Sequence, residues 1–173
     1  MAQPQQRSFR HASAIDKGKP LEEQFCLDQS IEFIDPAYTD EHVAAYPVEY
    51  LAGIDLYNQG EFHAAHDAWE ERWMGEVGPE EKLFLQAMIQ SAVAFHHLDI
   101  GRPGAARRMY QMAKEKFARL GKDVYMSLDL VGYQRQLDAA LSWLTSGPDP
   151  REIPRPNVEL PRITLLPGTN SLD

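Results

Sequence analysis

The stretch FLQAMIQSAVAFHHL, residues 84–98, decides the fold of this chain. It is apolar enough for the centre of a helical bundle, yet Gln86, Gln90 and His97 interrupt it. At about 100° per residue, these three side chains fall within roughly a 40° arc of one helix face. Buried amides are costly unless they are hydrogen-bonded. The pattern therefore predicts a central helix that carries a row of polar groups along one side.

Apolar periodicity and turn residues extend this prediction to an all-α bundle of about five helices over residues 41–146. Asp40 is a candidate cap for a helix that starts or kinks at Pro47. The expected helices are Val48–Asn58, Glu61–Met74, about Glu80–Ile100, Arg102 to about Leu120, and one that follows a short loop within Val124–Leu144.

A weak internal repeat relates the first two helix pairs. LYNQGEFHAAHDAW (56–69) and HLDIGRPGAARRMY (97–110) align with Gly60 opposite Gly101 and Trp69 opposite Tyr110. Each copy predicts a helix, a tight glycine turn and a second helix with small residues. This is the logic of tetratricopeptide-like helical pairs, although two copies are too few for a solenoid.

The two ends of the chain differ from the bundle in composition. Residues 1–40 are polar, and we expect a partly disordered N-terminal extension there. Residues 147–173 are rich in proline, which excludes a helix and disfavours a central strand. Apolar residues between the prolines predict an extended arm that packs on the bundle or on a second subunit in a homo-oligomer. A free disordered tail is the alternative.

Composition excludes several classes of function. The formal charge of −9 and the pI near 5.1 argue against a nucleic-acid surface and against an anionic membrane face. Cys26 is the single cysteine, so no internal disulfide can form. The chain shows neither a signal peptide nor a membrane-spanning apolar run, and we expect a cytoplasmic protein.

The helix expected at Glu61–Met74 carries the strongest candidate site. His66 and Glu70 are one turn apart, so an imidazole and a carboxylate can point to one place. This spacing suits a pair of metal ligands, or a histidine that is oriented by a carboxylate. His63 lies one turn earlier and is expected closer to solvent.

The antiparallel helix pair predicts which residues face this site. Folding about Gly78 brings Glu70 toward Gln86 and His66 toward Gln90. His97 would lie roughly 10 Å beyond Gln90 along the helix. It is therefore expected near Asn58 and His63, at the Gly60 turn.

Three interpretations of this polar strip remain open. The first is a closed hydrogen-bond network that fixes the register of two helices. The second is a divalent metal site with His66, Glu70 and His97 as ligands, in which His66 and Glu70 are the catalytic groups of a hydrolase. The third is a metal-free pocket for a small molecule. The residues expected to bind a ligand are Asn58, Trp69, Trp73, Gln86, Gln90 and His97.

Residues 48–120 also resemble a known family, the bacterial and archaeal proteins catalogued as domain of unknown function 309. The resemblance implies a compact all-α bundle, and family members have been labelled metal-dependent hydrolases. Ala64, Asp67 and Arg102 depart from the usual pattern, and residues 1–44 have no counterpart in it. The resemblance rests on Asn58, Gly60, Phe62, His66, Trp69, Glu70, Leu85, Gln86, Ile89, Gln90, His97, Gly101, Gly104 and Ala105.

Two functions from different classes follow. One is a metal-dependent hydrolase with its site between the second and third helices of the bundle. The other is a non-enzymatic tetratricopeptide-like binding or scaffold module whose polar strip is structural. A basic cluster, Arg102, Arg107 and Arg108, is most simply a solvated helix face, although Arg107 could meet an anion at the Gly101 turn.

Overall fold

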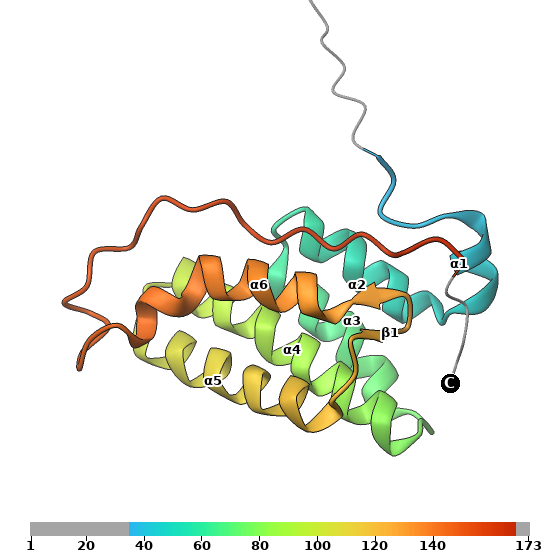
Figure 1. The fold of residues 1–173 in the computed structure, drawn as a ribbon, viewed down its shortest axis with the longest axis horizontal. Coiled ribbons are helices and arrows are strands. Elements are labelled where there is room, and N and C mark those ends of the chain that lie inside the picture. The colour runs from blue at the N-terminus through green and yellow to red at the C-terminus, as the bar shows by residue number, and fades with distance from the viewer. Residues whose placement is uncertain (1–34, 169–173) are drawn as a thin grey trace, which may run out of the picture. The chain divides into compact units, whose positions relative to one another are not determined.

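The computed structural model describes residues 35–168 and shows a mostly helical fold (Figure 1). The all-α fold class is confirmed, and the second to fifth helices form the packed bundle. The elements in chain order are α1 (Asp40–Ala45), α2 (Val48–Asn58), α3 (Phe62–Met74), α4 (Pro79–Asp99), α5 (Pro103–Leu120), β1 (Val124–Tyr125), β2 (Leu128–Asp129), α6 (Leu130–Leu141) and the short 3-10 helix η2 (Ser142–Thr145).

Helix α4, which contains the deciding stretch, packs against both α3 and α5. Phe84, Met88, Ala92 and Phe95 recur along it at helical spacing, and all are buried. Tyr133 links α6 to this core, because its hydroxyl donates to the Tyr57 hydroxyl of α2 at 3.0 Å. The apolar period of α4 thus places it at the centre of the bundle, as predicted.

Two glycine turns confirm the equivalence seen in the internal repeat. Gly60 follows α2 with φ of +80°, and Gly101 follows α4 with φ of +71°. Residues with a Cβ rarely adopt this left-handed conformation, whereas glycine adopts it freely. Each turn sends the next helix back along its predecessor, which makes α3 antiparallel to α2 and α5 antiparallel to α4.

The chain between α5 and α6 was predicted as a short loop followed by a helix, but it forms a small hairpin. Strands β1 and β2 pair antiparallel around Met126 and Ser127, which have φ of +46° and +58°. The Tyr50 hydroxyl donates to the Met126 carbonyl at 3.1 Å, and the Tyr46 hydroxyl lies 2.7 Å from the Ser127 hydroxyl. Contacts with distant tyrosines therefore help to hold a turn that contains no glycine.

The start of the bundle also differs by one residue from the expectation. Thr39, not Asp40, is the cap residue of α1, and its backbone N–H donates to His42 Nδ1 at 2.9 Å. Helix α1 ends before Pro47, which fixes φ at the start of α2. The predicted N-terminal extension lies mostly outside the described residues.

The proline-rich arm is extended and returns along the bundle of its own chain (Figure 1). The Asn58 side chain donates to the Ile163 carbonyl and accepts from the Ile163 N–H, both at 2.8 Å. Leu165 forms an isolated bridge with Leu128 of β2. Among the helices of residues 35–168, none combines the length and apolar character that a membrane crossing requires.

Candidate metal centre

Three potential metal ligands lie in the first two turns of α3, on its outer face or at the edge of its buried face. Phe62, Ala65 and Trp69 are buried and fix the inner face of the helix. His63 and Asp67, one turn apart, are then directed to the outside, with 62% and 58% of their side chains exposed. His66 lies at the edge of the buried face, with 23% of its side chain exposed.

Asp67 is the centre of this group. Its Oδ2 lies 3.2 Å from His63 Nδ1, and its Oδ1 lies 2.8 Å from His66 Nδ1. One ligand atom from each of the three residues can be chosen so that all lie within 4.8 Å of one another. Within residues 35–168, this is the group of histidine, cysteine and carboxylate side chains close enough to share an ion.

Glu70 lies on the other side of the His66 ring. Its Oε2 is 3.6 Å from His66 Nε2, while the Nδ1 of the same ring faces Asp67. His66 and Glu70, the one-turn pair expected from the sequence, therefore lie close together. Each of the two nitrogens of the His66 ring faces a carboxylate. A carboxylate on the far nitrogen of a metal-bound histidine fixes the orientation of the ring.

A row of imidazoles continues from α3 onto α4. The ring centroid of His63 lies 5.6 Å from that of His66 and 4.9 Å from that of His96. The His96 ring in turn lies 6.1 Å from His97. The predicted ligand His97 is therefore separated from the group of His63, His66 and Asp67 by the His96 ring.

The environment of His97 favours the neutral form of its imidazole. Burial lowers the pKa of His97, and the nearby charges of His96, Arg102 and Arg108 lower it further. Its Nδ1 is buried and has no hydrogen-bond partner in the described part of the chain.

The predicted ligand-binding residues do not share one environment. Gln86 lines a shallow groove beside α5 together with Arg119. Gln90 Oε1 and Trp73 Nε1 are buried without a hydrogen-bond partner among the described residues. Such groups cost about 1–3 kcal/mol each unless something pairs with them. The two amides of α4 therefore differ in environment, one at a groove and the other with a buried oxygen.

Two other predicted residues have clear structural contacts. Trp69 is fully buried, and its Nε1–H donates to the Tyr50 carbonyl at 3.1 Å. It packs so closely on Gly53 that a Cβ there would lie 2.1 Å from Trp69 Nε1. Asn58 uses both ends of its amide to hold the backbone of Ile163. These contacts describe a core residue and an anchor for the arm.

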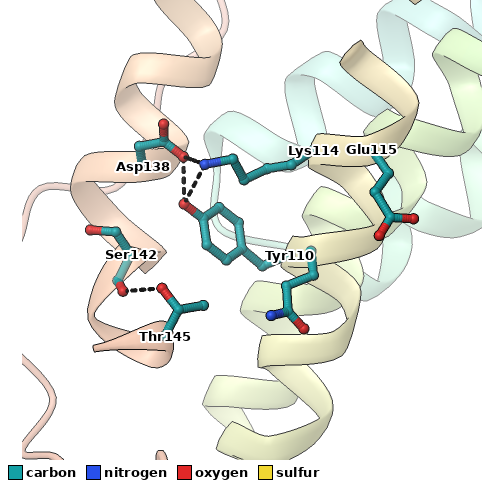
Figure 2. Close-up of a pocket in the computed structure, with 7 residues that line it drawn as sticks. Tyr110, Lys114, Glu115, Asp138, Ser142 and Thr145 are labelled. Carbon is teal, nitrogen blue, oxygen red and sulfur yellow. Dashed lines mark hydrogen bonds and ion pairs between the residues drawn. The ribbon is translucent and has the colours of Figure 1, made fainter. Parts of the chain in front are cut away.

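A separate hollow of about 630 Å³ lies between α5 and α6 (Figure 2). Figure 2 shows Tyr110 and Lys114 pointing toward Asp138; the Tyr110 hydroxyl donates to Asp138 Oδ1, and Lys114 Nζ lies 2.9 Å from the same oxygen. Burial and the hydrogen bond to Asp138 raise the pKa of Tyr110, so its phenol stays protonated. Since these groups satisfy one another, we interpret the cluster as a link between the two helices.

His63 and Asp67 were not among the candidate ligands expected from the sequence, which were His66, Glu70 and His97. The signal was nevertheless present in HAAHD, residues 63–67, where three donor residues fall within one helical turn. Two imidazole nitrogens and one carboxylate oxygen form a donor set that zinc accepts, and three protein ligands leave a coordination position for water. Atoms that share such an ion lie at most roughly 4 Å apart, so small side-chain rotations would complete the site.

Part of the chain matches a known protein family. A search of curated proteins finds no match. The match to a family model covers Tyr50 to Met109, which includes α3, α4 and both glycine turns. That model carries the description Domain of unknown function (DUF309), and the chain therefore contains a domain of this family at residues 50–109.

Proposed function

We propose that the chain binds a divalent transition metal of the zinc class through His63, His66 and Asp67, and that it is a metal-dependent hydrolase. The observation that carries the proposal is the Asp67 carboxylate, whose two oxygens lie 3.2 and 2.8 Å from imidazole nitrogens of two different histidines. An ion of this class, once bound, supplies an activated water molecule.

The residues of α3 have distinct roles in this proposal. His63 and His66 would hold the ion through imidazole nitrogens, and Asp67 would do so through a carboxylate oxygen. Glu70 orients His66 from its Nε2 side, and its 45% exposed side chain can also accept a proton from water at the surface. Because His63 and Asp67 are largely exposed, a substrate can reach the site without an opening movement.

Metal analysis of untagged protein, purified without chelator, tests the binding step. We expect about one zinc ion per chain, a count that falls in His63→Ala and Asp67→Ala. Glu71→Gln is the matched control, because Glu71 is exposed on the same helix outside the ligand group. Equal zinc content in all four proteins would refute the proposed site.

Hydrolysis of chromogenic acetate and phosphate esters tests the chemical step. We expect turnover to follow the zinc content of each variant. Glu70→Gln should retain metal but bind it about tenfold or more weakly, because an outer carboxylate supports its histidine. If no variant or wild-type sample binds metal, the binding or scaffold module becomes the better account of this helical surface.

A further inference from the structure

A second hollow, of about 680 Å³, lies where α5 begins and the arm leaves η2. Its wall contains four arginines and one carboxylate, while the whole chain has a formal charge of −9. A concentration of guanidinium groups in an acidic protein cannot be ascribed to a generally basic surface. The residues that matter below are Arg102, Arg107, Arg108, Asp149 and Arg151.

Arg107 builds the wall of this hollow. Its Nε donates to the Leu144 carbonyl at 2.7 Å, its Nη1 donates to the Pro148 carbonyl at 2.9 Å, and its Nη2 donates to the Gly147 carbonyl. The guanidinium thereby fixes the chain after η2 against α5. It keeps its positive charge beside the hollow, because carbonyl groups do not neutralise it.

The side chain of Asp149 shows that the wall of this hollow can hold a carboxylate. Its Oδ2 receives Arg151 Nη2 at 2.7 Å, and its Oδ1 receives the Arg151 backbone N–H at 2.9 Å. Arg151 lowers the pKa of Asp149 to about 2, and Arg107 contributes in the same direction. An anionic oxygen pair is thus already held on this arginine-lined wall.

Two charges remain uncompensated. Arg102 and Arg108 are exposed, and within residues 35–168 their side chains have neither a hydrogen bond nor an ion pair. Burial is the main cause that lowers the pKa of His97, and the charges of Arg102 and Arg108 lower it further, so their positive potential extends to this end of α4. The N–H groups of the first turn of α5 add a smaller contribution of the same sign.

We propose that this hollow, which we call the arginine pocket, binds the phosphate group of a small soluble molecule. Guanidinium groups match the oxygens of phosphate in charge and geometry. The volume exceeds that of a phosphate ion, so an ester of phosphate also fits. The proposal does not depend on the metal centre, because none of its residues is a ligand there.

Chemical-shift titration of the ¹⁵N-labelled full chain tests this site. The protein is kept with a chelator, so that a metal on α3 cannot bind the probe. Inorganic phosphate and glycerol phosphate are added separately at constant ionic strength. We expect saturable shifts at the amides of Gly101, Gly104 and Ala105, which line the pocket. Tighter binding of the ester identifies a phosphorylated molecule, and equal binding identifies phosphate itself.

Variants that remove one charge should change the affinity for phosphate in opposite directions, depending on the sign of the charge removed. Arg102→Gln and Arg108→Gln should each weaken binding about two- to fivefold, since an exposed ion pair contributes little. Asp149→Asn should tighten binding by a similar factor, because it removes the competing carboxylate. Arg119→Gln is the matched control at the other end of α5, and thermal melts show which variants are folded.

The outcomes are decisive for the arginine pocket. Absence of saturable shifts in the folded wild-type protein would overturn the proposal. So would equal affinities for the Arg102, Arg108 and Arg119 variants, or weaker binding by a folded Asp149→Asn variant. Loss of zinc binding elsewhere would leave the result of this titration unchanged.

Discussion

Replacing Asn58 with alanine should release the C-terminal arm. Asn58 donates to the Ile163 carbonyl and accepts from the Ile163 N–H, both at 2.8 Å, and Ile163 is fully buried. Each hydrogen bond contributes about 1 kcal/mol, and each buried backbone group left unpaired adds a penalty. We therefore expect a loss of about 2–4 kcal/mol in the free energy of unfolding, or roughly 6–12 °C in Tm for a chain of this size.

Urea denaturation measures the global loss, and hydrogen exchange at the Ile163 amide measures the local one. Asn58→Asp should fall about halfway between wild type and Asn58→Ala, because a carboxylate accepts from the N–H but cannot donate to the carbonyl. Asn157→Ala, an exposed position on the arm, is the matched control and should leave stability unchanged. If Asn58→Ala keeps wild-type stability and wild-type protection of Ile163, our assignment of Asn58 as the arm anchor is wrong.

Two further predictions concern packing and pH. Gly53→Ala should destabilise the fold by about 1–3 kcal/mol in urea, because its Cβ would lie 2.1 Å from Trp69 Nε1, whereas Gly104→Ala meets nothing within 4 Å and should not destabilise it. The hydrogen bond to Asp55 is the main cause that raises the pKa of Tyr38 to about 12. The contribution of this hydrogen bond to the free energy of unfolding is therefore complete below pH 10 and is lost between pH 10 and 12. Ultraviolet titration should therefore show one tyrosine ionising earlier in Asp55→Asn than in wild type, and an unchanged titration curve would refute this coupling.

The helices were predictable because each depends mainly on local features. Val48–Asn58 was predicted with the observed bounds, and the next three helices differ by about one residue at their ends. Apolar period and glycine turns provide this information, and Gly60 and Gly101 adopt the left-handed φ that the pattern required.

The hairpin between α5 and α6 could not be predicted in the same way. Met126 and Ser127 are not typical residues for a turn with positive φ. Contacts from Tyr46 and Tyr50, which are far away in sequence, help to stabilise that conformation. A long-range contact of this kind leaves no signal in the local residues.

The candidate site was predictable only where a single helix determines the geometry. The proximity of His66 and Glu70 follows from their spacing of one turn, as does the grouping of His63 with Asp67. Whether Gln86 and Gln90 join them depends on how α3 and α5 pack on either side of α4. Gln86 lines a groove with Arg119 of α5, whereas Gln90 Oε1 is buried, a difference that the spacing of the two residues on one helix does not reveal.

An anomalous difference map at the zinc edge, from crystals of the full chain grown with equimolar zinc, tests the metal centre most directly. We predict one strong peak about 2.0–2.2 Å from a nitrogen of His63, a nitrogen of His66 and a carboxylate oxygen of Asp67. A map without a peak on α3, or with its main peak at His96 and His97, would contradict the assignment.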